Sequence, residues 1–254
     1  MKRTIKLPAP QLSQLKEVNI DLCMTGRHFA LLATCEGELP EDVALSILKD
    51  LMEEDASKLT LTELRYLFML VKIHSLEGNY RVGAECTNYD DDGNYCGHNN
   101  VVNVTLADSD LNPTPPNYKV PEITWRTKDT EKTYKIMPPT MATESAIYDY
   151  FLTQKGANPE KIFNDKALRF EYGLIRAIVH LVDSDGNRLV KEDDSFEGLM
   201  EYLDYNDFIK VGKLQDAVTE VNKYGVQETW VECKCEKCGG KLLAHIPLLA
   251  GLAY

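Results

Sequence analysis

Two short segments, Cys235-Glu236-Lys237-Cys238-Gly239 and the pair Cys86 with Cys96-Gly97, decide how this chain folds. In each segment a cysteine is followed directly by glycine, which lets the backbone turn tightly beside a metal-bound thiolate. Strand-like sequence flanks both segments, at residues 79–85 and 101–106 and at residues 229–232 and 241–246. The sequence therefore predicts two β-hairpins that together form a zinc ribbon, split by a long insertion.

The four cysteines of these turns are the candidate ligands of a structural zinc ion, Cys86, Cys96, Cys235 and Cys238. Four soft thiolates favour a closed tetrahedral Zn²⁺ site, which stabilises a fold and leaves no open position for a substrate. Cys233 and His98 are alternatives for one ligand, although strand alternation also allows Cys233 to be only a neighbour of the site. The gap between Cys86 and Cys96 is longer than in a usual knuckle, and we expect it to bulge outward as a polar turn.

Composition narrows the classes of protein to consider. The formal net charge of -12 over 254 residues disfavours a broad phosphate-binding face. Seven cysteines, an odd number, argue against a fully paired disulfide framework, and Cys23 and Cys35 are expected to be ordinary core residues. The N-terminus lacks a signal-peptide pattern, and no stretch is apolar enough to span a bilayer, so we expect a soluble protein made in a cytoplasm.

The strongest local helix signal lies at Thr60. This residue is a predicted N-cap with Glu63 as its capping-box partner, and Leu59 and Leu64 stand at the hydrophobic-staple positions. The helix that follows is rich in apolar residues and is expected to pack against a helix over residues 41–53. Before these we expect an extended arm with a short strand over residues 18–22, and then a helix over residues 27–35.

The insertion shows its own pattern after the break at Pro113-Thr114-Pro115-Pro116. Strands are expected over residues 122–127 and 132–137, and Asp183 to Arg188 is expected to form a turn. Helices are expected from residue 143 onward, over residues 168–182, 196–203 and 207–222. The predicted fold class is α+β, with a helical N-terminal unit (residues 1–78), a split zinc-ribbon-like module (79–111 plus 226–254) and a mainly helical inserted domain (112–225).

No catalytic set emerges from the sequence, and we expect no enzyme activity. The five histidines are scattered without a nucleophile or metalloprotease spacing. Asp90 to Asp92 do not have the ligand pattern of a calcium loop and are expected to form a solvated acidic tip. Lys234, Lys237 and Lys241 surround the second knuckle, so a zinc-ribbon regulator that contacts nucleic acid or a polymerase is the alternative function. The acidic chain argues against it.

The helix-to-knuckle passage carries a family resemblance. The stretch Leu61 to Gly78 (LTELRYLFMLVKIHSLEG), the Cys86 to Cys96 hairpin and the strand Val101 to Leu106 resemble the baseplate hub assembly proteins of T-even-type contractile-tailed bacteriophages. Phe29 to Ala33 and Ala44 to Lys49 are similar to the N-terminal helices of that family.

The resemblance implies a structural or assembly component of a phage tail baseplate. Other tail and baseplate proteins would be its partners, and copies could be arranged as an oligomer within a symmetric assembly. The protein would be located in the virion tail, or in the host cytoplasm during assembly. Membrane and nucleic-acid partners are not expected.

Overall fold

The computed structural model describes residues 2–8, 12–34, 40–89, 93–111, 119–126, 131–190, 196, 208–222 and 229–246. Helices and small antiparallel sheets share this part of the chain, which confirms the predicted α+β class. The helices are α1 (Gly26–Thr34), α2 (Pro40–Leu51), α3 (Leu61–Ser75), α4 (Met141–Thr153), α5 (Pro159–Asn164), α6 (Lys166–Ile178) and α7 (Phe208–Asn222), with short 3₁₀ turns η1 (Ala56–Lys58) and η2 (Asp108–Asp110).

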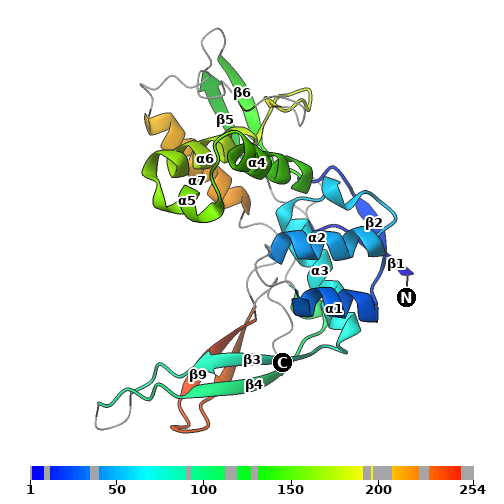
Figure 1. Ribbon diagram of the computed structural model, residues 1–254, viewed down its shortest axis with the longest axis vertical. Helices are drawn as coiled ribbons and strands as arrows, with labels where there is room; N and C mark the ends of the chain where they lie inside the picture. Colours follow the sequence, from blue (N-terminus) through cyan, green and yellow to red (C-terminus); the bar gives the residue numbers. More distant parts are fainter. Residues whose placement is uncertain are drawn as a thin grey trace.

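The strands of the described segments form four small sheets. They are β1 (Lys2–Lys6) with β2 (Glu17–Asp21), β3 (Asn79–Glu85) with β4 (Asn99–Thr105), β5 (Glu122–Arg126) with β6 (Glu131–Ile136) and β7 (Leu181–Val182), and β8 (Thr229–Lys234) with β9 (Lys241–Ile246). Along the longest axis of the molecule, the β3, β4 and β9 hairpins lie at one end, α1 to α3 in the middle, and α4 to α7 with β5 and β6 at the other end (Figure 1).

Helix α3 is the centre of the first hydrophobic core. Its capping box is confirmed, because the Thr60 hydroxyl accepts from the Glu63 N–H and a Glu63 carboxylate oxygen accepts from the Thr60 N–H at 2.8 Å. Most of the helix surface is apolar and buried, and α2 packs along it. The predicted staple residues Leu59 and Leu64 are both fully buried in this core. A helix this apolar is stable only when it is enclosed on several sides.

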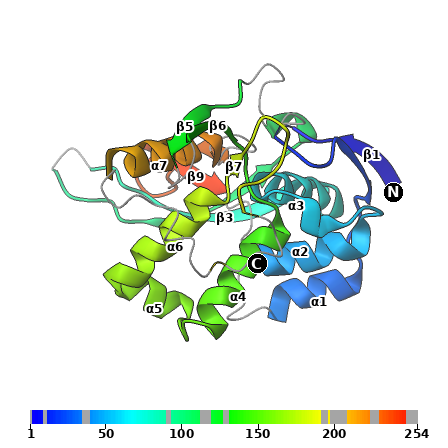
Figure 2. The ribbon, with the colours of Figure 1, turned by 90° about the horizontal axis from the view of Figure 1, so that it is seen from above.

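The inserted segment has a separate core. Side chains from β6, α4, α6 and α7 form it, among them Ile136, Phe151, Ile175 and Leu214. Asp165 ends α5 and also caps α6, because its carboxylate accepts from the N–H groups of Ala167 and Leu168. Figure 2 shows α4, α5 and α6 gathered on one side of the molecule and α1, α2 and α3 on the other.

The two cores meet where α3 and α4 begin. Thr60 and Thr140 are the N-caps of these helices, and the two residues form an antiparallel bridge. The Met141 N–H donates to the Leu59 carbonyl at 2.7 Å, and the Met141 side chain is part of the first core. A backbone contact of this kind fixes the start of the inserted helices against the N-terminal helices.

Several expectations from the sequence need correction. Cys23 is exposed and is not a core residue, because β2 ends at Asp21 and the side chain that turns inward is Leu22. The helix expected over residues 168–182 ends at Ile178, and Leu181–Val182 instead pair with β6. Both conformations would bury this apolar stretch, so hydrophobic periodicity could not separate them.

Other elements were missed or cannot be judged. Lys2–Lys6 form a strand paired with β2 where an extended arm was expected, and the short helix α5 was not expected. Cys35, the tip residues 90–92 and most of the expected helix over residues 196–203 lie outside the described residues. The domain boundaries stay a prediction. Among the described residues, no helix has the length and apolar character needed to cross a membrane.

We predict that Thr60→Ala lowers the free energy of unfolding by about 1 kcal/mol, because the cap hydrogen bond to the first turn of α3 is lost. Thermal and urea unfolding would measure the change. Thr153→Ala is the matched control, since Thr153 is exposed in the last turn of α4 and is not the N-cap of that helix. Equal effects of the two substitutions would contradict the importance of the cap.

Candidate metal centre

The first hairpin presents two cysteines just beyond its paired strands. The last strand pair is Glu85 with Asn99, and the Cys86 N–H donates to the His98 carbonyl at 2.9 Å. Between these two cysteines, an antiparallel bridge joins Tyr89 to Tyr95 and so closes the connection. This closure explains how the long gap between the cysteines can leave their sulfur atoms close together.

The second hairpin supplies a tighter knuckle. The Cys235 N–H donates to the Gly240 carbonyl and the Gly239 N–H donates to the Cys235 carbonyl, both at 2.9 Å. Gly97 and Gly239 have φ values of +54° and +70°, a region that side chains other than glycine rarely occupy. The two Cys-Gly steps that drew attention in the sequence are thus true turn positions.

The structure brings the four predicted cysteines into one cluster. Their sulfur atoms all lie within 4.8 Å of one another, with 3.6 Å from Cys86 Sγ to Cys238 Sγ and 3.8 Å from Cys96 Sγ to Cys235 Sγ. A zinc–sulfur bond of about 2.3 Å in a tetrahedron places two sulfur atoms about 3.8 Å apart. Both short contacts join one hairpin to the other, so an ion bound here would connect the two hairpins.

Neither alternative ligand belongs to this cluster within the described part of the chain. Cys233 lies in β8 opposite Leu242, and its thiol donates to the Leu242 carbonyl at 3.6 Å. It packs against the small core beneath the cysteines, as strand alternation allowed. His98 contributes its backbone carbonyl to the turn.

Two asparagines that sequence reasoning missed contact the sulfur atoms. Buried Asn100 donates from Nδ2 to Cys235 Sγ at 3.6 Å, and its Oδ1 accepts from the Glu236 N–H at 2.9 Å. Asn88 donates from Nδ2 to Cys86 Sγ at 3.2 Å and to the Lys241 carbonyl at 2.7 Å. Each side chain therefore ties one hairpin to the other. The contacts that cross between the hairpins join residues more than a hundred positions apart, so no local pattern could have identified them.

The Asn88 contact also accounts for a glycine. A Cβ atom built at Gly240 would lie 2.7 Å from Asn88 Nδ2 and 3.3 Å from Cys238 Sγ. A larger residue would therefore displace the asparagine from the sulfur. The Gly240 N–H itself points at Cys238 Sγ at 3.4 Å.

The thiols differ in how readily they ionise. Burial opposes ionisation of Cys235, but hydrogen bonds from the Cys238 and Lys237 N–H groups and from Asn100 outweigh it and lower the pKa of Cys235 to about 6. For Cys238 the Gly240 N–H favours the thiolate, yet lost solvation and the neighbouring thiols raise its pKa to about 12. The cluster thus favours one thiolate and resists the accumulation of four negative charges. A divalent cation would relieve that repulsion as the remaining protons leave.

The hairpins stack so that the cysteines close one edge of a small core. Ala84 from β3 meets Leu242 and Ala244 from β9 beneath the buried Cys86 and Cys235. At the far end of the same strands, Val82, Val104 and Ile246 join the core around α3. The four-cysteine cluster is therefore connected to the helical unit through continuous apolar packing.

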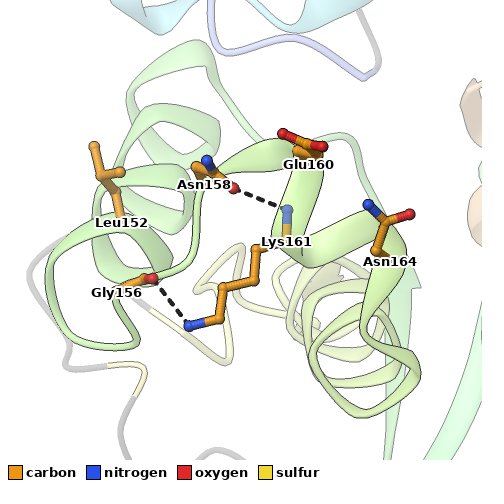
Figure 3. A pocket seen from close by; sticks show the side chains of 6 residues that line it. All are labelled: Leu152, Gly156, Asn158, Glu160, Lys161 and Asn164. Atoms are coloured by element: carbon orange, nitrogen blue, oxygen red, sulfur yellow. Dashed lines mark hydrogen bonds between the residues drawn. The ribbon is translucent and has the colours of Figure 1, made fainter.

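A pocket at the other end of the molecule gives no sign of catalysis. It has a volume of about 500 Å³ and lies between the end of α4 and α5, lined by Leu152, Gly156, Asn158, Glu160, Lys161 and Asn164. The Lys161 ammonium donates to the Gly156 carbonyl at 3.2 Å, and the Glu160 carboxylate points away from it (Figure 3). The pocket thus brings together no acid–base pair.

Fold and site together define an α+β protein in which two hairpins, far apart in the sequence, bring four cysteines together beside a helical core. The chain matches the family described as T4 bacteriophage base plate protein over residues 3–252, nearly its whole length, and so belongs to that family. The family resemblance seen in the helix and first hairpin is confirmed. Neither the curated proteins nor the solved structures gave a significant match.

We predict that the purified protein, prepared under reducing conditions without chelator, contains about one zinc ion per chain and that Cys86→Ser loses most of it. Elemental analysis and thermal unfolding would measure the effect. Cys233→Ser is the matched control, because that thiol lies outside the cluster and should leave the zinc content unchanged. Full zinc in the Cys86 variant, or none in the unmodified protein, would contradict the ligand assignment.

We predict that Asn100→Ser weakens zinc binding by about 10- to 100-fold, because Cys235 loses a hydrogen bond and the Glu236 N–H loses its acceptor. Competition with a chromogenic chelator would give the affinity. Asn99→Ser is the control, since Asn99 is the exposed neighbour on the same strand. Unchanged affinity in the Asn100 variant would show that this side chain serves packing alone.

Proposed function

We propose that this protein is a structural or assembly component of the hub region of a contractile-tail baseplate, and that it acts by binding other tail proteins. The family match over nearly the whole chain carries this proposal. The small sheets support it as well, because among the described residues each sheet has only two or three strands and so leaves strand edges for partner chains. On this proposal the protein is not an enzyme and is located in the virion tail or, during assembly, in the host cytoplasm.

The proposal includes a structural zinc ion held by Cys86, Cys96, Cys235 and Cys238. The support is the chemistry and spacing of the donor set, four thiols at distances that suit a tetrahedral ion. Zinc binding would become folding energy, since the two hairpins are far apart in the unfolded chain. The ion would hold the C-terminal hairpin on the hairpin that follows α3.

The proposed domain division keeps the boundaries expected from sequence, with residues 1–78, 79–111 plus 226–254, and 112–225 as the three parts. The core within the insertion and the small core beneath the cysteines support it, while Val82, Val104 and Ile246 of the ribbon-like module also pack into the core around α3. In this arrangement the two zinc-bound hairpins would hold both ends of the insertion in one place. They would present α4 to α7 as a unit beside the N-terminal helices.

The geometry of the site gives little support to the alternative function, a zinc ribbon that binds nucleic acid. The Lys241 ammonium lies 2.6 Å from the Glu232 carboxylate, and the Lys237 ammonium donates to the Cys96 carbonyl at 3.4 Å. Both lysines thus have protein partners beside the knuckle. A steep salt-dependent affinity for DNA or RNA, lost when Lys234, Lys237 and Lys241 are neutralised, would favour the alternative instead.

We predict that cross-linking of native tail precursors and mature particles places this chain next to other baseplate proteins. Lysine-reactive cross-links identified by mass spectrometry would name the neighbours, and comparison of the two preparations would separate a retained subunit from an assembly factor. Phage carrying Cys86→Ser should assemble fewer complete baseplates than phage carrying the Cys233→Ser control. Absence of the chain from both preparations, with normal assembly of the Cys86 variant, would overturn the proposed function.

A further inference from the structure

Two tyrosines stand exposed where the first hairpin extends past its cysteines. The exposed fractions are 68% for Tyr89 and 48% for Tyr95, so both belong to the exposed large apolar and aromatic residues of the described chain. Their ring centroids are 5.5 Å apart, with the ring planes tilted by 58°. The hairpin to which they belong lies at the end of the molecule farthest from α4 to α7 (Figure 1). The pair is therefore open to another molecule.

The pair is held in place before any partner arrives. Tyr89 and Tyr95 are joined by a backbone bridge, and the Tyr95 hydroxyl donates to a Glu85 carboxylate oxygen at 2.9 Å. The Tyr95 ring also covers Gly97, where an added Cβ would lie 3.2 Å from the ring. Because Gly97 directly follows Cys96, the cysteine cluster fixes the base on which the ring rests. Binding to such a surface loses little side-chain entropy.

The segment that carries the tyrosines is acidic in sequence, and one lysine of the second hairpin, Lys237, reaches the neighbouring Cys96 carbonyl at 3.4 Å. The sequence from Glu85 to Tyr95 contains one glutamate and three aspartates and no lysine or arginine. The chain as a whole carries a net charge of -12. A cation over a tyrosine ring is attracted by the negative face of the ring, and nearby carboxylates strengthen that attraction. An acidic or nucleic-acid partner would be repelled at the same place.

We propose that the Tyr89–Tyr95 pair is a docking site for a lysine- or arginine-bearing segment of a partner protein. Glu85 holds the Tyr95 hydroxyl and contributes negative charge, while the two rings receive the alkyl stem and cationic head of the partner side chain. Exposed tyrosines on a rigid support are typical of the few residues that contribute most of the binding energy of an interface. The identity of the partner as a tail protein rests on the proposed function, but the chemistry of the site does not.

The test uses the full-length zinc-loaded protein and three synthetic ten-residue peptides. One peptide carries four lysines, one carries four glutamates in the same positions, and one carries four serines. Backbone and tyrosine NMR signals would follow each titration. We expect binding of the lysine peptide alone, with shifts centred on Tyr89 and Tyr95 and an affinity that falls as salt is added.

Variants locate the site. Tyr89→Ala should weaken binding of the lysine peptide by about threefold to tenfold, whereas Tyr89→Phe should stay within about twofold because the ring is kept. Val101→Ala is the matched control, because Val101 is 53% exposed on β4 and away from the tyrosine bridge. If Tyr95→Ala loses zinc, Tyr95→Phe replaces it as the test of this position, because it keeps the ring on Gly97 and removes only the hydroxyl that bonds Glu85.

Three results would overturn the proposal: equal binding of the lysine and glutamate peptides, no binding of any peptide, or unchanged affinity in Tyr89→Ala. None of them would count against a baseplate role, which cross-linking of particles tests separately. Zinc content measured on each variant shows whether weaker peptide binding comes from loss of the docking site or from unfolding of the protein.

Discussion

The convergence of four cysteine sulfur atoms is the constraint on which the rest of this structure depends. Cys86 and Cys96 arrive from the hairpin after α3, and Cys235 and Cys238 arrive after the whole insertion has been made. Closing so long a loop is entropically costly. A disulfide that already closes a loop of about 100 residues in the unfolded chain removes this cost and stabilises a fold by about 5 kcal/mol. Thiols that bind a common ion can meet such a cost, because the binding energy adds to the folding energy.

The polar groups around the sulfur atoms are as specific as the cysteines. Asn88 and Asn100 come from the first hairpin, yet each also bonds the second, at the Lys241 carbonyl and the Glu236 N–H. A buried amide without such partners would destabilise the site. The same groups that contact the sulfur atoms therefore also define the register in which the two hairpins meet.

Local signals in the sequence were sufficient for much of the fold. The Thr60 and Glu63 pattern correctly predicted the start of α3, and the Cys-Gly steps correctly indicated two turns. The four cysteines predicted as ligands lie together in space, and their binding of metal is a proposal. Signals failed where distant partners decide the outcome. The strand at Leu181–Val182 exists because β6 is beside it, and Asn100 matters only because Cys235 returns to it.

The bridge between Thr60 and Thr140 has a mechanical consequence. It joins the N-cap residues of α3 and α4, while the two hairpins that carry the cysteine cluster lie beyond the other end of α3. A load applied to the inserted helices is thus divided between two anchor points on opposite ends of a single stiff rod. Bending at one anchor is resisted by the other, so the insertion should transmit displacement to the N-terminal helices with little loss.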